Sequence, residues 1–215
     1  MIRDSLIVLN TTKVGDSSMV LHTLSRTYGR RSFITSAGKG RGMALYLPLN
    51  ILDAEVVENP KSELWRLRGI SAKYPLNGIR SDVSKNSMTL FISEVLYRAI
   101  RSESMEPGLF EWCEKSILTL DSMTCSYANF HLRFLLELCG AMGFSPSPSD
   151  LAPFAGDQLR NLSYLVEAPF AQAMLLPLSG TSRNAAAEAV LQYLGFHTES
   201  RLNIQSLKVL RELFG

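Results

Sequence analysis

The residues best suited to chemistry in this chain are cations interleaved with aromatic side chains, between Leu24 and Pro48. From Arg26 to Arg41 there are five cations, two aromatic rings and no carboxylate. Cations follow a phosphate backbone, and exposed aromatic faces stack on unpaired bases. The pattern predicts a nucleic-acid-binding surface made of Arg26, Tyr28, Arg30, Arg31, Phe33, Lys39 and Arg41. The alternative is a hairpin whose arginines are only solvated.

A second group of cations could extend this surface. In Leu64–Tyr74 the residues alternate, so Arg66 and Arg68 share one face of a strand, and Lys73 follows near its end. Lys39 and Arg41 instead belong to the loop Gly38–Gly42, whose glycines let the backbone approach another surface closely. The loop and the strand are therefore two candidate places for phosphate contacts.

No enzyme motif accompanies these cations. The loop Gly38–Gly42 is not a P-loop, because no Ser or Thr follows its lysine and the G-x-x-x-x-G-K spacing is absent. Asp53 and Glu55 share a strand face and could hold a metal or act as acid and base. Without a histidine or glycine-rich partner, a solvated face is the expectation. We expect no catalytic residue and no cofactor.

The cysteines and histidines form no metal-binding pattern. Cys113, Cys125 and Cys139 lie 12 and 14 residues apart, and the three histidines are scattered. No C-x-x-C pair is present, so a zinc site is not expected. An odd number of isolated cysteines is typical of reduced core thiols in a cytosolic protein.

Charge is divided unequally along the 215 residues. Residues 1–80 carry 12 Lys and Arg against 6 Asp and Glu, whereas residues 81–215 carry 10 against 14. This division predicts a basic module that meets a polyanion, joined to a module with another role. No apolar run approaches the ~18 residues of a membrane span, and Leu6–Leu9 is too short for a signal peptide. We expect a cytoplasmic protein with no membrane partner.

Residues 1–80 are predicted to form a small barrel of about five strands joined by turns. An OB-type barrel and an SH3-like barrel fit the pattern almost equally well. Gly69 inside the last strand predicts a bulge that helps the barrel close. The expected strands are Ser5–Asn10, Met19–Ser25, Arg30–Thr35, Leu49–Val57 and Leu64–Tyr74.

Residues 81–215 are predicted to form an all-α bundle. The helix Thr124–Met142 is apolar on most sides, which indicates a central position with His131 in the core. One further helix is expected to begin at an Asp82 or Ser84 cap and to end at Ala99. The others are expected to span Leu109–Leu120, Asn184–Leu194 and Ile204–Phe214, and residues 149–181 are predicted to be less regular. The fold class is thus α+β multidomain: a nucleic-acid-binding barrel over residues 1–80 and a helical, partner-binding domain over residues 81–215.

The order of several motifs carries a family resemblance. The chain begins with a hairpin whose second strand ends in a Tyr-Gly turn, followed by the loop Gly38–Gly42 and a strand after Leu47-Pro48-Leu49. Later come Phe91–Arg101, Phe134–Pro146 (FLLELCGAMGFSP) and Ser206–Phe214 (SLKVLRELF). In this order, over the whole chain, they resemble the RecO family of bacterial recombination mediators. Many relatives carry a four-cysteine zinc module after the position of Gly143-Phe144. Residues 149–170 hold no cysteine here, so the chain resembles the zinc-free branch.

The resemblance implies a non-catalytic role in DNA repair. RecO-like proteins bind single- and double-stranded DNA and anneal complementary strands. With RecR they help RecA load onto single strands coated by single-strand-binding protein, which implies a nucleoid-associated protein. Two alternatives stay open: a protein-only adaptor with an incidental basic hairpin, and an RNA-binding barrel, which would look the same in sequence.

The resemblance also implies that the acidic, aromatic-ended tail of single-strand-binding protein docks on the helical part. Such a tail needs an apolar slot for the aromatic ring and cations at the rim for the carboxylates. Arg133 on the central helix and Lys208 and Arg211 on the closing helix are the candidates. The alternative is that these three cations only solvate the bundle.

Overall fold

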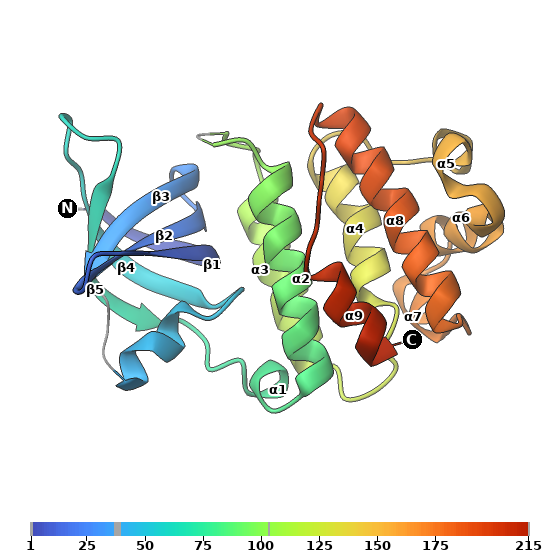
Figure 1. Ribbon diagram of the computed structural model, residues 1–215, viewed down its shortest axis with the longest axis horizontal. Coiled ribbons are helices and arrows are strands. Elements are labelled where there is room, and N and C mark those ends of the chain that lie inside the picture. The colour runs from blue at the N-terminus through green and yellow to red at the C-terminus, as the bar shows by residue number, and fades with distance from the viewer. Residues whose placement is uncertain (1, 37–39, 103, 215) are drawn as a thin grey trace. The chain divides into compact units, whose positions relative to one another are not determined.

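The computed structural model describes residues 2–36, 40–102 and 104–214. The chain begins with a closed β-barrel and continues as helices (Figure 1). This architecture confirms the predicted fold class, an OB-type five-stranded barrel followed by an all-α bundle.

The barrel closes in the strand order β1-β2-β3-β5-β4, with β4 returning to β1. Neighbouring strands are antiparallel except β3 and β5, which run parallel. The described pairing of β3 with β5 consists of Phe33 opposite Trp65 and Ile34 opposite Arg66. The strands are β1 (Ile2–Val14), β2 (Ser18–Ser25), β3 (Gly29–Ser36), β4 (Ile51–Val57) and β5 (Trp65–Ala72); the short 3-10 helix η1 (Gly40–Tyr46) lies between β3 and β4.

Period-two alternation builds the barrel core, because successive side chains of a strand point to opposite faces. The inward set of the strands is Leu6, Val8, Met19, Leu21, Phe33, Leu52, Ala54, Val56 and Leu67, and Tyr46 of η1 packs with them. On β1 and β2 the opposite face is also apolar and buried, at Ile7, Leu9 and Leu24. These two strands are therefore covered on both sides.

Two glycines shape the barrel through backbone conformations that other residues rarely adopt. Gly69 has a φ of +58° and lies where the register of β5 against β4 shifts, which confirms the predicted bulge. At Gly29, φ is +65°, and a Cβ atom would lie 2.1 Å from the carbonyl oxygen of Ser104. The start of β3 can approach the segment before α3 only because this residue has no side chain.

The helical elements follow the barrel without a further strand in the described residues. They are α1 (Asn77–Arg80), α2 (Val83–Ala99), α3 (Leu109–Ser122), α4 (Phe130–Ala141), α5 (Pro148–Ala155), the 3-10 turn η2 (Gly156–Gln158), α6 (Leu159–Glu167), α7 (Phe170–Leu175), α8 (Gly180–His197) and α9 (Leu207–Phe214).

Two helix predictions need correction. The predicted helix Thr124–Met142 starts too early, because Ser126 has a φ of +56° and α4 begins only at Phe130. The segment 149–181, predicted to be less regular, contains α5, η2, α6 and α7. These helices are short because Gly156 and Pro169 interrupt them, and Ser147 and Asp150 form a capping box at the start of α5.

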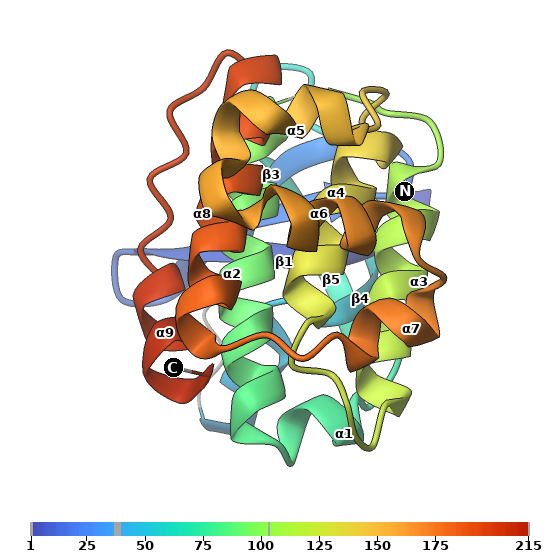
Figure 2. The same cartoon turned by 90° about the vertical axis from the view of Figure 1, so that its right-hand side faces the viewer.

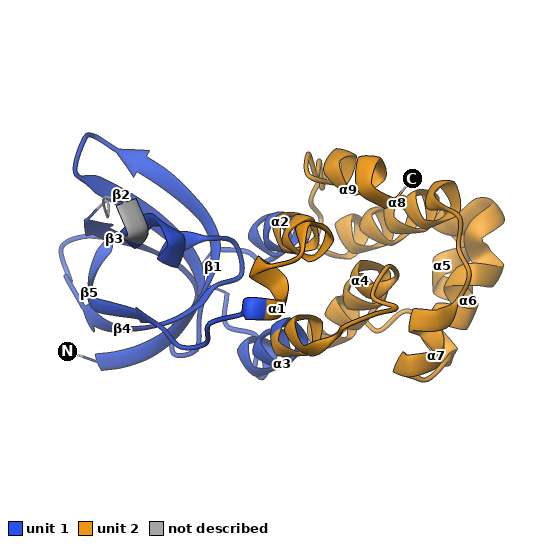
Figure 3. Cartoon of the chain, turned by 90° about the horizontal axis from the view of Figure 1, so that it is seen from below, with its two compact units in different colours: residues 1–77, 92–117 blue, residues 78–91, 118–215 orange. Residues whose placement is uncertain are grey.

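The chain divides into two compact units, drawn in blue and orange in Figure 3: residues 1–77 with 92–117, and residues 78–91 with 118–215. Helices α2 and α3 each contribute one part to each unit. The functional division predicted from the sequence, residues 1–80 and 81–215, stays a prediction.

In the second unit α4 occupies the centre, packed against α6, α7 and α8 (Figure 2). His131 on α4 is buried, with its ring 5.8 Å from that of Phe91 and 6.3 Å from that of Phe214. Burial lowers the pKa of His131 to about 3, so the ring is neutral at pH 7. His131 is a core residue, as predicted.

The cysteines correct one prediction. Cys113 and Cys139 are buried thiols, and burial raises the pKa of both, that of Cys139 to about 12. Cys125 is exposed, so it is not the core thiol predicted from the sequence.

The described residues contain neither a candidate membrane span nor a cluster of metal-binding side chains. None of their helices is long and apolar enough to cross a membrane. Among the same residues, no His, Cys, Asp and Glu side chains gather in threes or more where they could hold a metal ion.

Candidate nucleic-acid interface

The aromatic residue Phe33 lies in the barrel core. Its side chain is completely buried among the inward residues of the five strands. The prediction that Phe33 stacks on a base is therefore wrong, because the ring has no accessible face. Strand alternation places Phe33 inside together with Leu21, its partner on β2.

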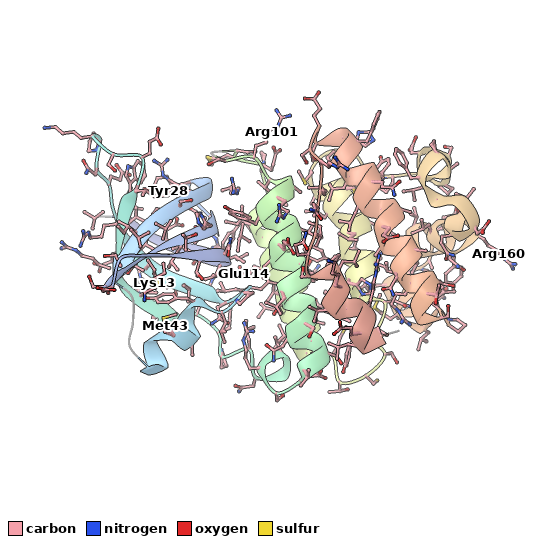
Figure 4. All side chains as sticks on the ribbon, viewed as in Figure 1. Lys13, Tyr28, Met43, Arg101, Glu114 and Arg160 are labelled. Carbon is pink, nitrogen blue, oxygen red and sulfur yellow. The ribbon has the colours of Figure 1, made fainter. Side chains whose placement is uncertain are left out.

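Two predicted DNA-binding cations bind carboxylates of the same unit instead. Glu114 of α3 accepts from Arg26 Nη2 at 2.8 Å through one oxygen and from Lys73 Nζ at 2.7 Å through the other. Arg26 also lies 3.4 Å from a Glu111 oxygen, and its guanidinium is 4.8 Å from the Phe110 ring centroid. Figure 4 labels Glu114 on α3. Arg26 and Lys73 thus hold α3 against the barrel loops.

A buried carboxylate positions the β2–β3 turn. Asp4 accepts hydrogen bonds from the hydroxyl groups of Ser25 and Thr27 and from the backbone N–H of Ser5. The Ser25 hydroxyl in turn accepts from the backbone N–H of Tyr28 at 2.8 Å. This network fixes the turn from which Tyr28 extends.

Arg30 and Arg31 leave β3 on opposite faces and meet different aromatic rings. The Arg30 guanidinium carbon lies 4.6 Å from the ring centroid of Tyr97, on α2. The same tyrosine ring lies 5.1 Å from His22, whose pKa is lowered by burial and by the charge of Arg30. Arg30 therefore makes a cation–π contact with Tyr97 of the same unit, and Arg31 makes one with Trp65.

Arg31, Trp65 and Tyr28 form a cluster at the end of the barrel that carries the β2–β3 turn. The Arg31 guanidinium carbon lies 3.6 Å from the Trp65 ring centroid, and Tyr28 meets Trp65 edge to face at 5.2 Å. The Tyr28 hydroxyl donates to Glu58 at 2.8 Å. Burial, and next the Glu58 carboxylate, raise the pKa of Tyr28 to about 12. Figure 4 labels Tyr28. Trp65 is not among the residues predicted from the sequence, because one sequence does not reveal the parallel pairing of β3 with β5.

The exposed cations of β5 flank a pocket. Arg66 and Arg68 alternate with the buried Leu67 and are exposed. Together with Thr35 and Ser36 of β3 they line a pocket of about 400 Å³. Two exposed guanidinium groups at the edge of such a pocket can bind phosphate oxygens. The sequence pattern of cations and aromatic residues gives no sign that Thr35 and Ser36 belong with Arg66 and Arg68, because they lie about 30 residues apart.

The loop cations cannot be placed. Lys39 lies outside the described residues, and the side chain of Arg41 is not described. The part of the loop that is described belongs to η1, where Met43 is exposed (Figure 4).

A groove in the helical unit brings two of the predicted partner-binding cations together. It has a volume of about 880 Å³ and lies between α8, α9 and the segment joining them. Lys208 and Arg211 line it with Arg201, and Phe196, whose side chain is 69% exposed, lines it with other apolar residues. Arg211 is also paired with Glu188 of α8. The groove combines apolar residues with three cations and two carboxylates, Glu188 and Glu199.

Arg133 has a different role from the one predicted. Its guanidinium donates to the backbone carbonyls of Leu165, Val166 and Ala168 at the end of α6, and to Glu137 at 2.6 Å. A cation that satisfies the free carbonyls of a helix end is structural. Arg133 is not among the residues lining the groove.

The chain is similar to known proteins of one name over nearly its whole length. Two family models match: Recombination protein O N terminal over residues 1–75, and Recombination protein O C terminal over residues 80–152. The chain is 30% identical to the DNA repair protein RecO of Phocaeicola vulgatus, with 97% of each chain covered. It is 29% identical to the protein of the same name from Bacteroides fragilis, again over 97% of each. With that of Flavobacterium psychrophilum it shares 27% identity over 99% of each.

Proposed function

This chain belongs to the RecO family of DNA repair proteins, and we propose that it is a non-catalytic, cytoplasmic recombination mediator. In this proposal it binds single- and double-stranded DNA, anneals complementary strands, and acts with RecR to load RecA onto single strands coated by single-strand-binding protein. Residues 1–80 bind DNA, and residues 81–215 bind partners.

The observation that supports DNA binding best is the pair of exposed arginines on β5. Arg66 and Arg68 are exposed and line a pocket together with Thr35 and Ser36. No ion pair is described for either arginine, whereas Arg26 and Lys73 meet Glu114. Cations without a carboxylate partner are free to release counterions from DNA, which makes binding independent of sequence and sensitive to salt.

Charge reversal tests this site. Replacing Arg66 and Arg68 together by glutamate should weaken binding to all DNA sequences alike. If each arginine neutralises one phosphate, the slope of log K against log salt should become shallower by about 1.4 for single strands and about 1.8 for duplex. Fluorescence anisotropy at several salt concentrations measures both quantities.

The matched control is Arg160→Glu, which reverses an exposed cation on α6 whose side chain extends away from the helices (Figure 4). If the salt slope of the double variant equals that of the control, Arg66 and Arg68 do not contact phosphate. The phosphate contacts would then be assigned to Lys39 and Arg41, which belong to the proposal but lie outside the described side chains. Tighter binding to RNA than to DNA of the same sequence would favour the RNA-binding alternative.

The groove between α8 and α9 is the proposed site for the tail of single-strand-binding protein. An acidic peptide with a terminal aromatic residue matches the apolar residues and the three cations of the groove, Lys208, Arg211 and Arg201, which outnumber its two carboxylates, Glu188 and Glu199. The ion pair of Arg211 with Glu188 would have to open, and Lys208 is exposed without a described partner. Arg133 is left out of this site, since its donors are engaged by α6.

Calorimetry with a synthetic tail peptide tests the groove. Lys208→Glu with Arg211→Glu should abolish peptide binding while DNA binding by the barrel persists. The control is again Arg160→Glu, which should bind the peptide like the unmodified protein. Native peptide affinity in the double variant would place the tail elsewhere. Peptide binding by an unmodified protein that binds no DNA would instead favour a protein-only adaptor.

A further inference from the structure

Arg31 and Trp65 form an unusual stack at one end of the barrel. Trp65 begins β5, and Arg31 precedes by two residues Phe33, the β3 residue that pairs with Trp65. The guanidinium carbon is 3.6 Å from the indole centroid, a close cation–π contact. Arg31 Nε is buried and has no hydrogen-bond partner among the described residues.

Barrel packing alone does not account for this arginine. The core residues beside it are apolar, and a buried N–H without an acceptor destabilises the folded state. An aliphatic side chain would cover Trp65 without that cost. A guanidinium differs from an aliphatic side chain in having two flat faces, and the guanidinium carbon lies over the indole ring.

The neighbours of the stack favour a base over a phosphate. Tyr28 braces Trp65 edge to face at 5.2 Å, and Glu58 holds the Tyr28 hydroxyl at 2.8 Å. Asp4 lies close enough for its charge to act on Tyr28. Two carboxylates at this barrel end repel phosphate, whereas a neutral, flat ring can stack on an arginine plane.

The position along the strand joins this cluster to the proposed phosphate contacts. Arg66, the next residue of β5, lines the pocket of about 400 Å³. Trp65 lies on the core side of β5 with Leu67, and Arg66 faces away from it, so a strand that meets Arg66 through its backbone would reach Trp65 and Arg31 around the start of β5.

We infer that one unpaired base stacks on the outer face of the Arg31 guanidinium, above Trp65, and that this contact makes the barrel prefer single strands over duplex. The inference rests on the proposed DNA binding and adds the residues that recognise a single strand. A duplex keeps its bases stacked on one another and cannot supply this contact without unpairing.

Tryptophan fluorescence tests the stack directly. The chain has two tryptophans, so Trp112→Phe leaves Trp65 as the only one. Saturating oligo-dT should change Trp65 emission, and a duplex of equal length should not. The ratio of single-strand to duplex affinity should fall about 5- to 150-fold in Trp65→Leu, the effect of losing one base–aromatic stack.

A second variant separates the flat face of Arg31 from its charge. Arg31→Lys keeps the charge, so the salt slope should not change, but the single-strand preference should fall as in Trp65→Leu. Arg160→Lys is the matched control and should keep the full preference. These measurements remain decisive if Trp65→Leu does not fold, since the Trp112→Phe protein and Arg31→Lys keep Trp65.

The outcomes separate the inference from the proposed function. Binding of both DNA forms with no change in Trp65 emission would overturn the stack and leave DNA binding intact. Binding of neither form at low salt would overturn both. A Trp65 response of equal size to duplex would show that the cluster does not select single strands.

Discussion

Neutralising Glu114 should make the protein less stable and yet a stronger DNA binder. Glu114 is 13% exposed and bridges Lys73 and Arg26, which are 22% and 42% exposed. A hydrogen bond to a charged group contributes roughly 1.5–3 kcal/mol, and a pair as exposed as that of Arg26 contributes at most about 1 kcal/mol. Since glutamine keeps one acceptor, we expect Glu114→Gln to lower the free energy of unfolding by roughly 1–3 kcal/mol.

The same change frees two cations for phosphate. If Arg26 and Lys73 each then meet one phosphate, the salt slope should become steeper by about 1.4 for single strands and about 1.8 for duplex. Urea denaturation measures the loss of stability, and anisotropy at several salt concentrations measures the slope.

The two opposite effects make this prediction easy to refute. A purely structural role for Glu114 predicts lower stability with unchanged or weaker DNA binding. Glu137→Gln is the matched control, because it also removes one negative charge from an ion pair with an arginine, on α4. An equal increase in DNA affinity in Glu137→Gln would assign the gain to net charge and refute the reasoning.

Two further predictions concern the cores. Phe33→Ala should lower the free energy of unfolding by about 3–5 kcal/mol in urea denaturation, because the ring is completely buried; lost DNA binding with unchanged stability would contradict its core position. His131 should make the protein less stable in acid, because burial lowers its pKa to about 3 from 6.5 and the unfolded chain takes up the proton first. The contribution of neutral His131 to the free energy of unfolding should be fully present above pH 6.5 and lost progressively toward pH 3. Between pH 7 and pH 5 this contribution should fall by about 2 kcal/mol. His131→Leu should show a smaller loss of stability over the same pH range, and an unchanged loss would contradict the assignment.

The barrel could be predicted because its signals are local. In β3 the alternation around Phe33 indicates which residues share a face, and Gly69 indicates where the last strand bulges. The start of α4 could not be predicted, because apolar residues from Thr124 onward fit a helical period equally well. Only the positive φ of Ser126, set by the surrounding turn, stops the helix before Phe130.

The candidate site was harder to predict because its cations have partners far along the chain. Arg26 meets Glu114 across 88 residues, and Lys73 meets the same carboxylate across 41. Arg133 meets the end of α6 more than 30 residues later. Composition shows which side chains carry charge, but only the fold shows which of those charges are already neutralised.

The short pairing of β3 with β5 has a mechanical consequence. Four of the five strand contacts are long antiparallel ladders, while the fifth consists, in the described residues, of two residue pairs. Opening the cylinder along that seam breaks the fewest backbone hydrogen bonds, so local unfolding should begin there. An opened seam exposes strand edges able to pair with another extended chain. The side of the barrel that holds Arg66 and Trp65 is thus also where the sheet unrolls most easily.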